Sequence, residues 1–281
     1  MNRLLGALIV VLWLVALSAV LVRDVVPYWR TQSPPSGKLP SGDYQTGIYT
    51  AGGERIGTSW TSLNPQPDMI TVHSNTLLDG RLPVPTAANI SSLSIDSTFS
   101  MSAPDNRLVG FELTLRHDGE QIAELRGHQV GEDYACVAQV GELTRHFSLD
   151  ARATSVLTES LRPFNHLPNL HVGQSWRIRM LDPVALLRDQ TAATVPQLVR
   201  VAGRETIDHA GRAVACFRIE TDGAIAWADE TGRVLRQRVE LPLLGRFELR
   251  DEPFDQTARA KARRRTAAQP GERGVRGSPK G

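Results

Sequence analysis

Short runs of alternating apolar and polar residues fill the chain between residues 43 and 255. The run at 108–115 puts Phe111, Leu113 and Leu115 on one side of an extended segment, with polar residues between them. This period of two is typical of a strand with one buried face. Comparable runs predict further strands at residues 47–60 (a hairpin), 69–77, 93–101, 121–130, 134–140, 143–149, 199–207, 213–221, 225–228, 234–241 and 246–250.

Tight-turn dipeptides separate these runs. They are Gly52-Gly53, Asp118-Gly119, Gly141-Glu142, Ala210-Gly211, Asp222-Gly223 and Thr231-Gly232. Helical patterns occur only at residues 151–161 and 182–189. We therefore expect a mainly β fold, a curved antiparallel sheet of half-barrel shape with one or two short helices. Such a sheet either presents a concave apolar surface to a ligand or partner, or closes on a filled core.

The N-terminus carries an uncharged apolar stretch at residues 4–22, which includes Leu4, Val10, Trp13 and Val22. A helix of that length spans about 28 Å, close to the ~30 Å hydrocarbon core of a bilayer. The sequence thus predicts a transmembrane anchor at residues 1–23. A linker rich in Pro, Ser and Gly follows at residues 24–42, and the β-rich domain occupies residues 43–255.

A cleaved secretory signal is the alternative to a retained anchor, with Ala16 to Ser18 as a weak cleavage site. The apolar run is longer than most signal cores, and Trp29 follows it at the level of an interfacial aromatic belt. We favour the retained anchor. We expect a single-pass protein of the bacterial inner membrane with most of the chain in the periplasm, although the distribution of arginines fixes the orientation only weakly.

The C-terminal residues 256–281 contain many cations and almost no large apolar residue. We interpret this segment as a disordered basic tail, since it cannot bury enough surface to offset its ordering entropy. Lys261, Arg263, Arg264 and Arg265 could bind an anionic surface, or the tail could simply be solvated. Charge alone predicts no specific nucleic-acid binding.

Cys136 and Cys216 are the only cysteines, and both lie in apolar strand contexts. Two alternatives remain open at this stage. They form a disulfide if they face each other in an oxidising compartment, or they pack as two buried free thiols.

No catalytic, cofactor or metal motif is present. His166 and His171 flank Pro168, and their spacing does not place both on one helical face. Ser59 lacks the glycine spacing of a nucleophile turn. Trp60, Trp176 and Trp227 are predicted to be core or sheet-face anchors, and we expect no cofactor and no enzymatic activity.

Several short segments resemble a known family. They are the opening hairpin with Gly47, Gly52, Gly53 and Gly57, the stretch 170–176 followed by Asp182 and Pro183, and the stretches 229–235 and 241–245. Together they resemble bacterial periplasmic β-rich proteins of unknown function related to LolA-type lipoprotein carriers. The resemblance implies an open half-barrel that binds or carries an apolar group. It implies no catalytic residue.

Three function classes follow from these patterns. The first is a membrane-anchored binding module for a lipid-like or acyl ligand. The second is a structural accessory subunit of an inner-membrane complex that acts through protein–protein contacts. The third, least favoured, is an enzyme. A large apolar cavity would favour the first class, and an exposed apolar patch with a filled core would favour the second. Convergent polar side chains in a cleft would favour the third.

Overall fold

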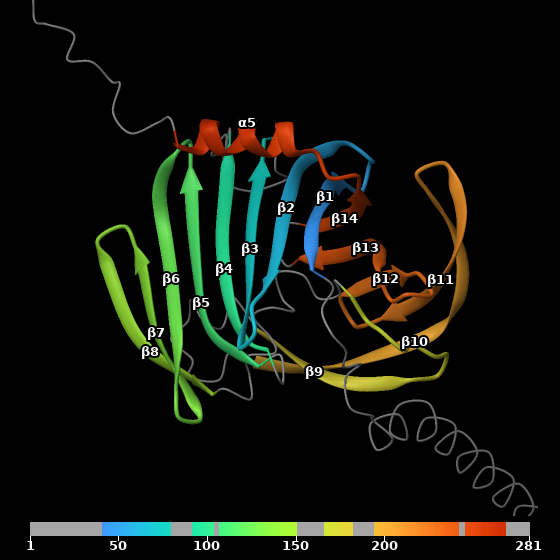
Figure 1. Cartoon of the computed structure of the whole chain (residues 1–281), viewed down its shortest axis with the longest axis horizontal. Helices are drawn as coiled ribbons and strands as arrows, with labels where there is room; N and C mark the ends of the chain where they lie inside the picture. The colour runs from blue at the N-terminus through green and yellow to red at the C-terminus, as the bar shows by residue number, and fades with distance from the viewer. Residues whose placement is uncertain are drawn as a thin grey trace, which may run out of the picture.

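Within the residues that the structure describes, the fold is one large antiparallel sheet of 14 strands and a single helix, which lies across the top of the sheet in Figure 1. The computed structural model describes residues 41–79, 92–103, 107–150, 166–181, 194–241 and 245–267. The strands are β1 Gly42–Thr50, β2 Arg55–Pro65, β3 Met69–Leu78, β4 Leu93–Ser102, β5 Leu108–His117, β6 Glu120–Val130, β7 Asp133–Val140, β8 Leu143–Asp150, β9 Ser175–Leu181, β10 Thr194–His209, β11 Arg212–Glu220, β12 Ala224–Ala228, β13 Val234–Leu241 and β14 Gly245–Glu252.

The strand order divides the sheet into two meanders. β1–β8 follow one another outward on one side, and β14–β9 follow one another outward on the other. The first and last strands pair at the centre, where Gln45 lies opposite Glu252. β8 and β9 are the two edges, so the sheet is not closed. The expected mainly β, antiparallel fold is confirmed. In Figure 1 the strands of the second meander run across the direction of β2–β6.

The turn dipeptides act as the sequence predicts. Asp118 and Gly119 both have positive φ (49° and 85°), as do Ala210 and Gly211 (52° and 75°). Two successive positive φ values characterise the hairpin turns that match strand twist. β9 was not among the predicted strands, although Trp176 and Ile178 alternate there with arginines.

The helix α5 (Gln256–Ala267) corrects one prediction. The interpretation of residues 256–281 as disordered is wrong for this first part, whereas residues 268–281 lie outside the described ranges. Phe254, Ala258 and Ala262 pack on Trp60 and Leu77 of β2 and β3. Their spacing of four residues forms one narrow apolar stripe, and the small alanines let the helix approach the sheet closely.

Three predicted segments lie outside the described residues. They are the anchor at residues 1–23 and the two short helices at 151–161 and 182–189. Within the described ranges, no helix combines the length and the apolar character needed to cross a membrane.

Directly opposed residues of antiparallel neighbours point to the same side of a sheet, so the registers assign a face to each side chain. We call the face that bears Leu63, Phe111 and Trp176 the core face, because the two largest hydrophobic clusters lie on it. The opposite face, which bears Trp60 and carries α5, is the helix face. Trp60, Trp176 and Trp227 are buried, which confirms their interpretation as core or sheet-face anchors.

Candidate ligand-binding face

The core face of the first meander is built around a row of side chains that crosses seven strands. Successive register partners form the row Leu63, Val72, Phe99, Phe111, Gly127, Cys136 and Phe147. Gly127 has no side chain, and the ring of Phe111 fills the space above it. A Cβ at Gly127 would lie 2.3 Å from that ring. Tyr134 is fully buried beside this row and donates a hydrogen bond to the carbonyl of Leu108.

Farther along the same strands, apolar side chains continue on this face but are less buried. We call these six residues the open strip: Ile95, Leu113, Leu115, Leu125, Val140 and Leu143. The first four are half-buried, and the last two are 58% and 59% exposed. Large apolar side chains left half-covered on a contiguous face are typical of a binding surface rather than of a filled core.

A cluster of hydroxyl side chains on β2 and β3 adjoins the open strip. Ser59, Thr61, Ser74 and Thr76 are joined by mutual hydrogen bonds of 2.8–3.3 Å. Thr76 lies directly opposite Ile95. The core face of the first meander therefore passes from leucines on β5 and β6 to hydroxyls on β2 and β3. Ser59 and Thr61 are buried, and Ser74 and Thr76 are half-buried.

The core face of the second meander is different, because it is filled. Trp176, Val199, Val201 and Ile219 are at most 2% exposed and pack with five further buried apolar residues. Arg204 caps this cluster with its guanidinium 4.7 Å from the ring of Phe217. Among the residues described here, this half of the core face therefore serves stability and leaves no comparable apolar surface.

The helix face of the second meander carries a network of arginines, acids and aromatic rings instead of an apolar cover. Its centre is the Glu248 carboxylate, which is 10% exposed and contacts three guanidiniums. Arg236 and Arg250 lie 2.7 Å from it, and Arg238 lies 2.9 Å from it. Burial alone would raise the pKa of Glu248, but the hydrogen bonds from these arginines lower it to about 2.

The network continues on both sides of Glu248. Arg236 and Arg238 lie 5.5 and 5.3 Å from the ring of Trp227, and the indole Nε1 of Trp227 donates to Glu205 at 2.9 Å. On the other side, the guanidinium of Arg250 stands 4.3 Å from the centroid of Tyr49. These contacts join β1, β14, β13, β12 and β10 through charge-assisted and cation–π interactions.

Glu252 closes this network at the centre of the sheet. It accepts hydrogen bonds from Gln45 (2.9 Å), Tyr49 (2.7 Å) and Arg55 (2.7 Å). Although burial acts to raise the pKa of Glu252, these donors and the Arg55 charge leave it lowered. Gly47 makes the arrangement sterically feasible, because a Cβ there would lie 2.1 Å from the Glu252 carboxylate. The glycine that the sequence singles out thus leaves room for an ion-pair site.

Asp251 ties the tip of the β10–β11 hairpin to the central strands. Its carboxylate is 11% exposed and pairs with Arg233 at 2.9 Å and with His209 at 3.6 Å. Burial is the main cause of its raised pKa, and the Arg233 hydrogen bond opposes that effect. The arrangement is a structural clasp, since the contacts join segments remote in sequence.

The two cysteines are free thiols in the structure and lie in different clusters. Cys136 belongs to the core-face cluster with Phe111, and Cys216 packs with Ile207 and Trp227 on the helix face. Of the two alternatives left open by the sequence, the structure has the buried free thiols. Burial raises the pKa of both thiols to about 11, so neither is poised as a nucleophile.

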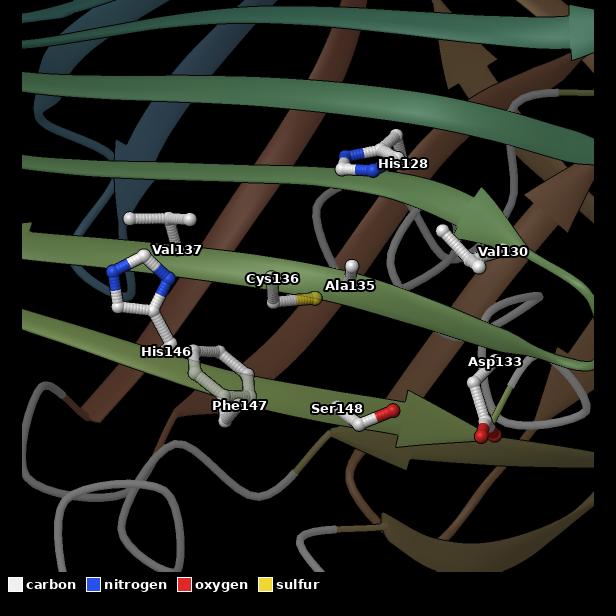
Figure 2. A pocket seen from close by; sticks show the side chains of 9 residues that line it. All are labelled: His128, Val130, Asp133, Ala135, Cys136, Val137, His146, Phe147 and Ser148. Carbon is white, nitrogen blue, oxygen red and sulfur yellow. The ribbon is translucent and has the colours of Figure 1, made fainter.

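A shallow depression of about 550 Å³ lies at the sheet edge formed by β6–β8 (Figure 2). His128, Cys136, His146 and Phe147 are among its lining residues. Figure 2 shows Val137 and His146 side by side on adjacent strands, as their register requires. Within the described ranges, no group of three or more His, Cys, Asp or Glu side chains could hold a metal ion.

Comparisons with known proteins assign no family to this chain. No family model and no curated protein matches it. Among solved structures, the hypothetical lipoprotein YmcC from Escherichia coli (K12) is similar over 85% of this chain and 95% of its own, with 14% sequence identity and a TM-score of 0.28. A TM-score this low does not establish a common fold, and the resemblance to lipoprotein-carrier relatives remains a hypothesis.

The structure describes only some of the residues singled out in the sequence, and these lie in different parts of the fold. The two cysteines are described but remote from one another, and the four anchor residues lie outside the described ranges. Lys261, Arg263 and Arg264 are exposed on α5. The open strip was not predicted as a site. The alternation of Leu113 and Leu115 with polar residues predicts an apolar sheet face, but a filled core gives the same pattern. The Glu248 network was not predicted either, although its central members Arg236, Arg238, Glu248 and Arg250 lie on the consecutive strands β13 and β14.

Proposed function

We propose that this chain is a membrane-anchored, extracytoplasmic binding module without catalytic activity, and that its core face takes a lipid-like or acyl ligand. The observation that carries the proposal is the open strip. Ile95, Leu113, Leu115 and Leu125 form a contiguous half-covered apolar surface beside a hydroxyl cluster. Covering an apolar surface contributes about 25 cal/mol per Å², so an acyl chain laid along the strip would bind favourably.

Location is part of the proposal. An anchor at residues 4–22 would hold the domain beside a bilayer, where ligands of this chemistry are abundant. An open sheet suits this role, because a bulky amphiphile reaches an uncovered face more easily than a closed cavity.

Native mass spectrometry of the full-length protein, extracted gently from membranes, tests the proposal. A reproducible lipid mass should be retained by the wild type and lost in Leu115→Asp. Glu112→Lys is the matched control, since Glu112 is exposed on the opposite face of the same strand. Retention in Leu115→Asp, or absence of lipid from all three proteins, would contradict the binding role.

A second candidate function rests on the most exposed end of the open strip, together with the neighbouring Ile122. Ile122, Val140 and Leu143 are 38–59% exposed and lie together at the end of the β6–β8 hairpins. An exposed apolar end beside a free edge strand also suits a protein partner in an inner-membrane complex. A lipid-free protein that loses a membrane partner when Leu143 becomes Asp would favour this structural role.

A further inference from the structure

The helix α5 separates its basic side chains into two groups. Arg259 turns inward, with its side chain 15% exposed, 3.4 Å from Asp43 and 5.6 Å from the ring centroid of Phe254. Lys261 and Arg264 are exposed. The helix contains no acidic residue at all. Docking by Phe254, Ala258 and Ala262 therefore holds the outward cations at fixed positions on the helix face.

The composition of the outward surface limits what it can bind. Apart from its cations, α5 exposes only Gln, Thr and Ala, so it offers nothing large and apolar for insertion into a bilayer. Its affinity would be electrostatic. A flat anionic surface would bind such a helix better than an apolar groove would. Each basic side chain near an anionic leaflet adds to the attraction.

The entry of the chain into the domain lies beside the same helix. Asp43 is the second residue of β1, and the backbone of Asp255 donates to the side chain of Gln45 at 3.0 Å. The sequence predicts that residues 24–42 link this point to the membrane anchor. A flexible segment of that length has a root-mean-square span of about 25 Å, so the anchor would keep α5 within reach of the bilayer surface.

We propose that the exposed basic side of α5 binds the anionic phospholipid surface of the membrane in which the chain is anchored. The inference rests on the proposed membrane attachment, but not on the ligand of the core face. It orients the domain so that α5 looks toward the headgroups.

Amine labelling of Lys261 tests this orientation. The full-length protein is combined with nanodiscs of phosphatidylcholine alone, or of phosphatidylcholine with phosphatidylglycerol, and the labelling rate of Lys261 is followed by mass spectrometry. In the anionic discs only, we expect the labelling rate of Lys261 to fall roughly five-fold for each basic side chain that contacts the lipid. The rate should recover in high salt. Equal rates in both discs, or equal protection in neutral discs, would overturn the proposal.

A substitution distinguishes a lipid surface from simple shielding. Arg264→Gln should restore much of the Lys261 labelling in anionic discs. Arg246→Gln should not, because Arg246 is a 74% exposed arginine on β14, outside the helix. Unchanged protection in Arg264→Gln would contradict the electrostatic contact. Protection that appears only in native membrane extracts would point to an acidic protein and would also overturn it. Lipid retention measured by native mass spectrometry should be the same in both variants, which separates this inference from the ligand-binding proposal.

Discussion

The ring of Phe111 occupies the space above Gly127 that a side chain would otherwise fill. The two residues lie opposite each other on β5 and β6, and the contact lets the buried row cross the sheet without a gap. It also marks the boundary of the site, because the half-covered leucines begin one register step farther along the same strands.

Gly127→Ala should destabilise the domain. The added Cβ would sit 2.3 Å from Phe111, and overpacking of this kind costs about 1–3 kcal/mol. Chemical denaturation measures the loss. Gly203→Ala is the control, since no atom lies within 4 Å of the site of its Cβ, and the account is wrong if both substitutions have the same effect.

Glu248→Gln should lower the free energy of unfolding at neutral pH by about 3 kcal/mol, because three arginines lose their shared counter-charge. Glu240→Gln removes an exposed pair with Arg246 and should cost less than about 1 kcal/mol. Equal losses in the two variants would show that the Glu248 cluster is an ordinary surface feature.

The same carboxylate predicts a pH dependence. Its pKa is lowered from 4.5 to about 2 in the folded protein, so the native state binds fewer protons than the unfolded state between those values. The stabilisation is complete above about pH 4.5 and is lost as the pH falls toward 2. Unfolding curves should therefore show the gap between wild type and Glu248→Gln narrowing over this interval. A gap that stays constant would contradict the assigned ion pairs.

Ala262→Arg should release α5 from the sheet. Ala262 is 3% exposed against Trp60 and Leu77, and an arginine cannot fit there without displacing the helix. Hydrogen exchange should become fast throughout residues 256–267. The exposed neighbour Ala260→Arg should leave exchange unchanged, and a protected helix in Ala262→Arg would refute the described docking.

Much of the fold could be predicted from the sequence because its signals are local. Alternation at residues 108–115 and the Asp118-Gly119 turn specify a hairpin without reference to the rest of the chain. The pairing of β1 with β14 could not be predicted, since Gln45 and Glu252 are 207 residues apart and no local pattern joins them. The Glu252 site follows from that pairing and was missed with it, whereas the ion pairs of Glu248 form within the β13–β14 hairpin.

Helix α5 was missed for a different reason. Low apolar content usually indicates disorder, yet Ala258 and Ala262 suffice here because they pack together with Phe254 against Trp60 and Leu77. The open strip was ambiguous, since Leu115 alternates as it would in any sheet. Only the exposed fraction of the side chains in the strip distinguishes a binding surface from a core.

Photo-crosslinking with a diazirine-bearing acyl chain tests the binding face most directly. The full-length protein in membranes is irradiated with the probe, and the modified residues are mapped by mass spectrometry. We predict labels concentrated on β4–β6, at Ile95, Leu113, Leu115 and Leu125, that are competed away by unlabelled lipid. Labels confined to the predicted anchor at residues 4–22, with none on the sheet, would contradict a ligand-binding core face.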